Sequence, residues 1–531
     1  MLTYQANPAD VDHMIADDHL IVEQQFLCLE SGRGDRRALV DQVAFELTLH
    51  ATAEERVIYP ALRDAGLDPE ADLATSEHQT VKELLVVLDR EDPGTSEFED
   101  ALSELIRAVR HHVIEEEGRL LPQLRVSVGP EGMVELGQQF LEAKRSAPTR
   151  SHPHAPSTGI GHALTDVAAR IVDLARDIAS GRQERLATDA TGRLVPQAQA
   201  IADAYASLGP QPVEILTPDL ARRQPGPDAG VRAVLEAAGA HGPEPVGSVE
   251  DIAIPDAAGG EQTLRVYRPL DPGPAGDGPQ PVILWIHGGG WVLYDIDTYD
   301  ASCRGLCNKT GAVVVSPDYR RSPEAPFPSA YDDVLAAWRW GAAHAADLGV
   351  DPDRMAIGGE SVGGTMAAAT ALALRGDGGT GDPAPSALVC VYPLTTAEEL
   401  GDSMVEEADA RPLNKAVLSW MAMHAFAHTP DAVADWRVDL LSVGADRLGL
   451  LPPTLIVLAE RDPLRSQGQQ LADQMRAAGV DVACTTYAGV MHEFFGAAAV
   501  LDEAERAQRE AAELFLRGFG VAPIGAGPAN R

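Results

Sequence analysis

A serine stands between glycines in the segment 359–363, which reads Gly-Glu-Ser-Val-Gly, and a cluster of three glycines follows a histidine in the earlier segment 287–291. A serine on a sharp turn between a strand and a helix exposes its hydroxyl as a nucleophile. Backbone N–H groups of clustered glycines can closely approach the oxyanion that forms when a nucleophile attacks a carbonyl. The two motifs therefore predict acyl transfer with Ser361 as the nucleophile.

A serine nucleophile needs a base and an acid, and on strand–turn–helix scaffolds the chain order is serine, acid, histidine. Asp462 follows the apolar run 454–459, and His492 follows the strand-like stretch 482–487. Functional groups gather on loops at the ends of strands. We predict that His492 is the general base and that Asp462 orients it.

Alternating strands and helices would hold these groups in place. The run 281–286 is continuously apolar, residues 355–358 lead into the serine turn, and 362–374 continue as a small-residue helix. This pattern favours a mostly parallel sheet with helices on both faces. Taken singly, the serine motif could be a turn, Asp462 a helix cap and His492 a loop histidine. Their order and their positions at strand ends favour catalysis.

These residues resemble the hormone-sensitive-lipase-like branch of the α/β-hydrolase carboxylesterases. The likeness includes residues 318–328, where the family has D-Y-R-L-A-P-E-x-x-F-P, and residues 216–222, and it covers roughly 195–520. The resemblance implies an α/β hydrolase fold with a helical cap and hydrolysis of small to medium carboxylic esters without a cofactor. It also implies that the oxyanion hole is formed by the N–H groups of Gly288, Gly289 and Val362.

The sequence departs from the family pattern at four positions. Glu360 and Val362 replace the usual Asp and Ala beside the nucleophile, and a β-branched side chain there would narrow the acyl site. Glu493 stands where the family commonly has Gly, and Ser466 where a second acid often follows the catalytic one. We expect these changes to affect substrate range more than reaction type. An inactive scaffold is the alternative, but every triad position carries the required chemistry.

Histidine and glutamate recur at helical spacing in the first 130 residues. Four stretches carry the apolar stripe of one helix face, and the stripes include six ionisable residues: His19, His50, Glu54, His78, His112 and Glu116. Residues four apart point the same way, so each glutamate lies beside the histidine that precedes it. Burying such groups without partners or metal would cost on the order of several kcal/mol each. The set predicts two metal ions bridged by carboxylates, with iron or manganese suited to the mixed ligands.

This segment resembles the hemerythrin-like HHE cation-binding domain, including Tyr59-Pro60 and Leu121-Pro122. The resemblance implies an all-α four-helix bundle with a non-haem di-iron centre. Oxygen-carrying hemerythrins have H-x-x-x-H on the third helix, whereas Lys82 lies four residues after His78. We therefore expect redox, peroxide, nitric oxide or iron sensing rather than reversible O2 carriage. Neighbouring residues that could substitute as ligands are Glu55, His111, Glu115 and Glu117.

The length of 531 residues predicts more than one domain. We expect a metal-binding bundle at 1–145, a linker at 146–194, an esterase domain at 195–520 and a flexible tail at 521–531. The linker would contain an amphipathic helix with one apolar face formed by Val167, Ile171, Leu174 and Ile178.

The formal net charge of −38 disfavours nucleic acids and anionic membrane surfaces as partners. No signal peptide or membrane-spanning run is recognisable, which favours a cytoplasmic location. Five scattered cysteines indicate reduced thiols. A small-molecule ester is the expected partner, and a homo-oligomer is compatible with the sequence.

The leading hypothesis is a serine carboxylesterase with an N-terminal non-haem iron domain. The competing hypothesis is a metal, oxygen or redox sensor whose hydrolase domain is a regulated output. A third hypothesis, in which the bundle only drives oligomerisation, ranks below both.

Overall fold

The computed structural model describes residues 10–152, 173, 176, 177, 179–271, 278–375, 381–397 and 401–521. The chain forms two compact units. The first comprises Met1–Arg193, Tyr205–Leu220 and Val405–Trp420, and the second comprises Leu194–Ala204, Ala221–Met404 and Met421–Arg531. The domain boundaries read from the sequence stay predictions. The residues Val167, Ile171, Leu174 and Ile178 of the expected linker helix lie outside the described residues.

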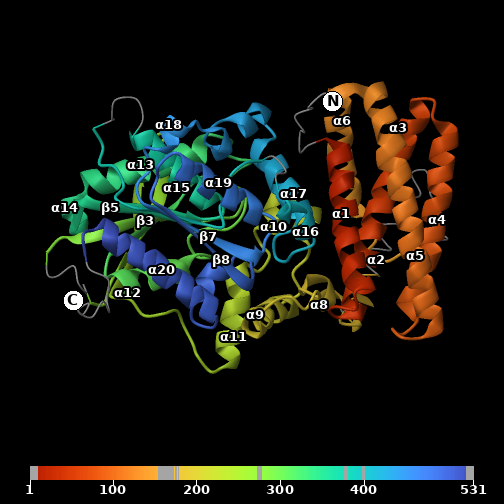
Figure 1. Ribbon diagram of the computed structural model, residues 1–531, viewed down its shortest axis with the longest axis horizontal. Helices are drawn as coiled ribbons and strands as arrows, with labels where there is room; N and C mark the ends of the chain where they lie inside the picture. The colour runs from red at the N-terminus through yellow and green to blue at the C-terminus, as the bar shows by residue number, and fades with distance from the viewer. Residues whose placement is uncertain are drawn as a thin grey trace. The chain divides into compact units, whose positions relative to one another are not determined.

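The first unit contains a bundle of four long helical rods (Figure 1). Their bounds are α1 (Val11–Glu30); α2 (Arg36–Ala53), a π-helical turn (Glu54–Ile58) and α3 (Tyr59–Asp64); α4 (Asp68–Arg90); and α5 (Ser96–Glu115), a π-helical turn (Glu116–Leu120) and α6 (Leu121–Ser146). Side chains of Asp35 and Thr95 cap α2 and α5 by accepting hydrogen bonds from backbone N–H groups. The apolar stripes meet in a core that includes Phe26, Leu85 and Phe98. The predicted four-helix bundle is confirmed.

Helix α6 continues well past the residues that indicated the fourth predicted helix, and it ends at Ser146, close to the expected bundle limit of 145. At Gly129 the backbone adopts φ 73°, and Pro130 follows, so the helical rod is kinked there. A Gly-Pro pair is typical of a helix end, which is why the sequence did not predict the continuation. The second half of α6 buries Phe140 and Lys144, and the ring centroid of Phe140 lies 6.2 Å from that of His50.

An eight-stranded sheet forms the centre of the second unit, in the order β1-β2-β4-β3-β5-β6-β7-β8. Strand β2 is antiparallel to both neighbours, and the other adjacent pairs are parallel. The bounds are β1 (Ser248–Pro255), β2 (Glu261–Arg268), β3 (Gln280–Ile286), β4 (Val313–Asp318), β5 (Val350–Glu360), β6 (Leu388–Val391), β7 (Thr454–Arg461) and β8 (Val482–Met491).

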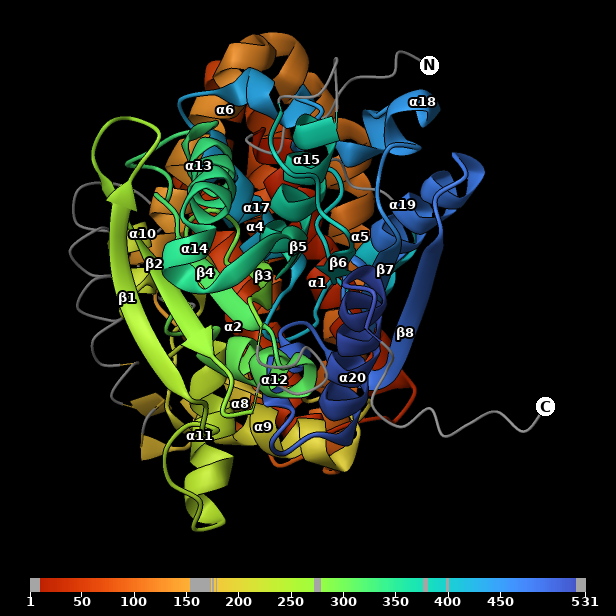
Figure 2. The same ribbon diagram turned by 90° about the vertical axis from the view of Figure 1, so that its left-hand side faces the viewer.

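Helices cover both faces of this sheet. Helices α12 (Asp300–Thr310) and α20 (Asp502–Gly518) lie on one face, and α13 (Ser329–Ala343) and α15 (Val362–Arg375) lie on the other (Figure 2). Because both faces are covered, the central strands are apolar along most of their length, as Trp285, Val389 and Val457 in the core illustrate. The predicted α/β hydrolase fold is confirmed.

Shorter helices complete the described part of the chain: α8 (Arg182–Ala187), α9 (Pro196–Ser207), α10 (Pro218–Ala221), α11 (Pro227–Ala237), α14 (Ala345–Leu348), α16 (Ser403–Glu406), α17 (Lys415–Phe426), α18 (Ala445–Leu448) and α19 (Arg465–Ala477). Among the described helices, none combines the length and hydropathy that crossing a bilayer requires.

Candidate active site and candidate metal centre

Ser361 lies on a strained turn between β5 and α15. Its φ of 55° is a left-handed value that a non-glycine residue adopts at a cost. The flanking glycines permit the turn, because a Cβ at Gly359 would lie 2.5 Å from the Gly363 carbonyl carbon and a Cβ at Gly363 would lie 2.2 Å from Ile286 O. The Ser361 N–H is fixed by a 2.9 Å bond to Val391 O on β6. The structure therefore has the strand–turn–helix context predicted for a nucleophilic serine.

The glycine loop after β3 lies beside this serine. A Cβ added at Gly288 would lie 3.1 Å from Ser361 Cβ, and Gly289 has a φ of 96°. Tyr319 supports the loop, since its hydroxyl donates to Gly288 O at 3.0 Å and its ring stacks on His287 at a centroid distance of 4.1 Å. The 318–328 motif thus contributes a scaffold for the loop.

His492 and Asp462 form a buried pair at the ends of β8 and β7. The distance between His492 Nδ1 and Asp462 Oδ2 is 2.7 Å, and the Leu464 N–H donates to Asp462 Oδ1 at 2.8 Å. Burial alone would lower the pKa of His492, but the charge of Asp462 and the hydrogen bond to it raise that pKa. The pairing fixes Nδ1 as the protonated nitrogen and leaves Nε2 for proton transfer.

Glu360, which directly precedes Ser361, is a buried hydrogen-bond acceptor. Glu360 accepts hydrogen bonds from Trp285 Nε1 at 3.1 Å and from the Tyr392 hydroxyl at 2.5 Å. Burial and the charge of Glu493 raise the pKa of Glu360 to about 7. The Glu360 carboxylate therefore joins Trp285 of β3 to Tyr392, which follows β6.

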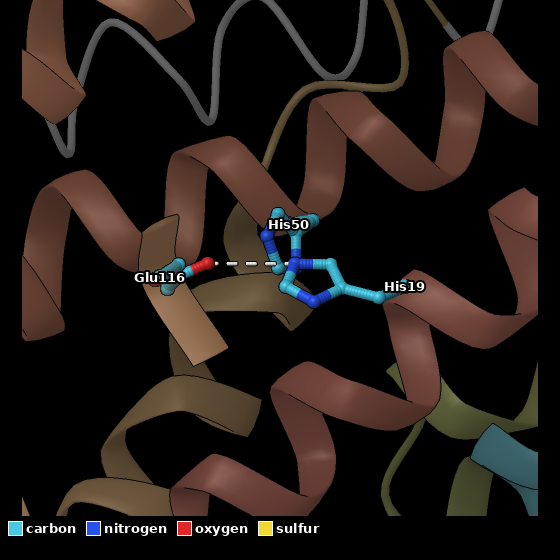
Figure 3. Close-up of side chains that lie close together, drawn as sticks. All are labelled: His19, His50 and Glu116. Carbon is cyan, nitrogen blue, oxygen red and sulfur yellow. Dashed lines mark ion pairs between the residues drawn. The ribbon is translucent and has the colours of Figure 1, made fainter. Parts of the chain in front are cut away.

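The six predicted metal-binding residues converge inside the bundle in two groups. One contains His19, His50 and Glu116, and the other contains Glu54, His78 and His112; within each group the candidate ligand atoms lie within 4.8 Å of one another. Figure 3 shows the first group, with the imidazoles of His19 and His50 close together and Glu116 facing His19. Glu54 and Glu116 are each the first residue of a π-helical turn. Such turns occur frequently at functional sites, and the sequence did not predict them.

The two carboxylates connect the two groups. Glu116 Oε2 lies 3.4 Å from His19 Nε2 and 3.5 Å from His112 Nε2, which belong to different groups. Glu54 likewise places Oε1 3.3 Å from His50 Nε2 and Oε2 3.2 Å from His78 Nε2. Each carboxylate therefore faces both groups, as a bridging ligand would.

The donor atoms fit a cation. Within the described part of the chain, hydrogen-bond partners are lacking for the buried atoms His19 Nε2, His50 Nε2, Glu54 Oε1 and both carboxylate oxygens of Glu116. Burial would raise the pKa of Glu54, but His50, His112 and His78 hold it well below its usual value. Burial would lower the pKa of His19, but Glu116 and Glu117 raise it to about 9. The carboxylates that face His19 thus favour positive charge at that position.

Outer carboxylates lie within 3.1 Å of Nδ1 in three of the four histidines, and Glu55 Oε1 lies 3.5 Å from Nδ1 of the fourth, His78. Glu117 lies 2.8 Å from His19 Nδ1, Asp18 lies 3.1 Å from His50 Nδ1, and Glu77 lies 2.9 Å from His112 Nδ1. A carboxylate at Nδ1 fixes the tautomer whose Nε2 can ligate a metal. The sequence did not predict this role for Asp18 and Glu77. Asp18 precedes the candidate ligand His19, and Glu77 precedes the candidate ligand His78, but only the packing of separate helices shows that they contact His50 and His112.

The alternative ligands lie outside the two groups. Lys82 Nζ binds both carboxylate oxygens of Glu55, at 2.6 and 2.7 Å, which provides that carboxylate with a cation of the protein's own. His111 is largely exposed and lies 3.3 Å from Glu77. Tyr59 approaches instead, with its hydroxyl 3.0 Å from His78 Nε2 and 3.3 Å from Glu54 Oε2.

Two family models match the chain. Residues 10–124 match the hemerythrin HHE cation binding domain, and residues 283–496 match a model described as alpha/beta hydrolase fold. The matches fall on the metal-ligand groups and on the segment from the glycine loop to His492.

Curated relatives and solved structures match the hydrolase part. Esterase LipI of Mycobacterium tuberculosis is 38% identical over 264 residues, covering 49% of this chain and 78% of the relative. The ethyl acetate hydrolase of Pseudomonas putida is 33% identical over a match that covers 48% of this chain and 79% of that relative.

Among crystal structures, a thermostable esterase from Pseudomonas putida has a TM-score of 0.53 at 32% identity, covering 61% of this chain and 97% of that one. An ester hydrolase from the metagenome of Lake Arreo has a TM-score of 0.54 at 31% identity, covering 62% and 100%. The chain therefore belongs to the alpha/beta hydrolase fold family of esterases and carries a hemerythrin HHE cation binding domain ahead of it.

Proposed function

We propose that the protein is a serine carboxylesterase that hydrolyses small to medium carboxylic esters. The observation that carries this proposal is the buried His492–Asp462 pair, with 2.7 Å between Nδ1 and Oδ2, in a sheet that also presents Ser361 on a strained turn. The esterase names of the relatives support the same reaction class.

In this mechanism His492 Nε2 accepts the proton of Ser361 Oγ as the oxygen attacks the ester carbonyl. The N–H groups of Gly288, Gly289 and Val362 stabilise the resulting oxyanion. Nε2 then gives the proton to the departing alcohol, which leaves an acyl-serine. Water, deprotonated by the same nitrogen, releases the acid, while Asp462 stabilises the imidazolium in both halves of the reaction.

Ser361→Ala tests this mechanism. Hydrolysis of a short-chain 4-nitrophenyl ester should fall by about 10⁴-fold or more, and an organophosphonate should label Ser361 in the unmodified protein. Ser442→Ala, on an exposed serine, is the control. Retention of hydrolysis within about tenfold in Ser361→Ala would falsify the assignment.

We also propose that His19, His50, Glu54, His78, His112 and Glu116 hold two non-haem iron ions, with manganese as the alternative metal. The two glutamates that each face both ligand groups support two ions rather than one. When bound, such a pair supplies one-electron redox chemistry. The histidines supply Nε2, and Glu117, Asp18 and Glu77 hold their rings in the ligating orientation.

Metal analysis of the purified protein tests this second proposal, with about two iron ions expected per chain. A sensor whose hydrolase is its output is a second candidate, favoured by Lys82 in place of the third-helix histidine of oxygen carriers. Ester hydrolysis by iron-loaded and metal-stripped protein discriminates between the two. Equal rates indicate independent functions, and a several-fold difference indicates regulation.

A cytoplasmic location and a small-molecule partner rather than nucleic acid fit the charge of −38.

A further inference from the structure

Glu493, the residue after the candidate general base, has a backbone conformation that glycine would adopt without strain. Its φ is 70°, and the described non-glycine residues with positive φ are Trp291, Tyr294, Ser361, Tyr392 and Glu493. Left-handed backbone at a non-glycine residue costs energy and is retained where the surrounding structure requires that side chain. The strain therefore directs attention to what the Glu493 carboxylate does.

The Glu493 carboxylate is fixed beside the reacting groups. The Tyr299 hydroxyl donates to Glu493 Oε1 at 2.7 Å, and the same oxygen lies 3.9 Å from His492 Nε2. Tyr299 extends the link to the glycine loop, because a Cβ added at Gly288 would lie 2.5 Å from its hydroxyl. The Glu493 side chain is 9% exposed, so it is largely buried but retains access to solvent.

The position of this carboxylate indicates which half of an ester it would meet. His492 Nε2 delivers its proton to the departing alcohol, so groups next to Nε2 face the alcohol half rather than the acyl half. Burial raises the pKa of Glu493 above its usual value, and the charge of His492 and the Tyr299 hydrogen bond offset only part of this rise. Two further carboxylates, Asp462 and Glu360, lie in the same region and act on the pKa of His492. The alcohol side of the site is therefore acidic.

We propose that Glu493, held by Tyr299, forms a subsite for the alcohol half of the substrate and favours esters whose alcohol carries a positively charged ammonium group. This inference rests on the proposed function. A carboxylate a few ångströms from the alcohol stabilises a cation there and repels an anion. The formal net charge of −38 acts in the same sense by attracting cationic substrates to the protein.

A matched pair of acetate esters tests the subsite on the full-length protein. Acetylcholine and 3,3-dimethylbutyl acetate have nearly the same shape and yield the same acetyl-serine, so the ratio of their kcat/KM values reports recognition of the charge during acylation. Glu493→Gln should lower the acetylcholine-to-dimethylbutyl ratio by about tenfold. Tyr299→Phe should lower it by a smaller factor, because the carboxylate stays but its orientation is less restricted.

The control is Glu510→Gln, which removes the charge of the carboxylate that accepts from the Tyr487 hydroxyl, at 3.0 Å, in a similar tyrosine–glutamate pair on β8 and α20. It should leave the ratio unchanged. If Glu493→Gln slows both esters equally, the pair has only a structural role and the proposal is overturned. An unchanged ratio overturns it as well.

Two further measurements cover the remaining outcomes. Labelling of Ser361 by an organophosphonate in each preparation separates the two proposals. If Ser361 is labelled but the ratio of kcat/KM values for the two esters does not change, only the subsite is rejected. If Ser361 is not labelled, the triad and the subsite are rejected together. If Glu493→Gln does not fold, competitive inhibition of the unmodified protein decides. Choline should inhibit at lower concentration than 3,3-dimethylbutanol, and the reverse order rejects the subsite.

Discussion

The chain contains two buried clusters of histidine and carboxylate that differ in which ring nitrogens contact the carboxylates. In the second unit one histidine, His492, has the Asp462 carboxylate on Nδ1, and its Nε2 lies 3.9 Å from Glu493 Oε1. In the first unit four histidines direct ring nitrogens at two shared carboxylates, and several of the buried donor atoms have no hydrogen-bond partner among the described residues. The same two residue types therefore have different proposed roles, proton transfer in the second unit and cation binding in the first, because the inward atoms of the first cluster face one another.

Asp462→Asn should have the largest effect, which is a loss of ester hydrolysis in the second unit. An amide can donate to His492 Nδ1 and so stabilises the tautomer with the proton on Nε2, where it blocks acceptance of the serine proton. We expect kcat for a short-chain ester to fall by about 10⁴-fold. The iron content should not change. Asp473→Asn, at a largely exposed aspartate on α19, is the control; a loss of less than about tenfold in Asp462→Asn would contradict the tautomer argument.

Glu54→Gln should weaken iron binding by the helical bundle of the first unit. The amide keeps the shape of the side chain but removes the charge and one acceptor that face both ligand groups. We expect the affinity for iron to fall by more than the roughly 10- to 100-fold typical of losing an outer-shell partner, measured by competition with a chelator. Glu77→Gln, which removes the charge of the partner of His112 Nδ1, should give a loss no larger than that range and is the matched comparison. Equal iron affinity in Glu54→Gln and the unmodified protein would mean that Glu54 is not a ligand.

Alanine substitutions at two glycines should sharpen the contrast in backbone geometry. A Cβ at Gly363 would lie 2.2 Å from Ile286 O, whereas a Cβ at Gly118, in the second π-helical turn, meets nothing within 4 Å. Gly363→Ala should cost about 1–3 kcal/mol in the free energy of unfolding, measured by denaturant titration, and it should also impair hydrolysis. Gly118→Ala should be neutral or stabilising by up to about 1 kcal/mol. Equal denaturant midpoints of unfolding for the two variants would show that the turn around Ser361 tolerates a methyl group.

The fold and the grouping of the six candidate ligand residues could be predicted because both rest on local patterns. Apolar periodicity indicated four helices and a buried sheet, and residues four apart on one helix must share a face. The chemistry of Ser361, Asp462 and His492 was legible because their order and their places at strand ends are restricted. The roles assigned to them remain predictions.

The missed features depend on contacts between segments distant in the sequence. Asp18 meets His50, and Glu77 meets His112, from separate helices, and no spacing rule links such pairs. The continuation of α6 past Gly129 was missed because local propensity opposes it, while burial of Phe140 and Lys144 outweighs that opposition. Glu493 was visible only as a departure from a family pattern, and its contact with Tyr299 required the structure.

The smallest expected effect concerns the pH dependence of hydrolysis. Burial lowers the pKa of His492, but Asp462 first and Glu493 next raise it above its usual value. The base must be neutral to accept a proton, so kcat/KM should rise with pH through a pKa above the ordinary histidine value of about 6.5. Glu493→Gln removes one of the charges that raise this pKa, and the rising limb should therefore move to lower pH. Glu510→Gln should leave it in place. A limb that stays fixed in Glu493→Gln would show that this carboxylate does not act on the imidazolium, and the electrostatic difference between the two clusters would then rest on Asp462 alone.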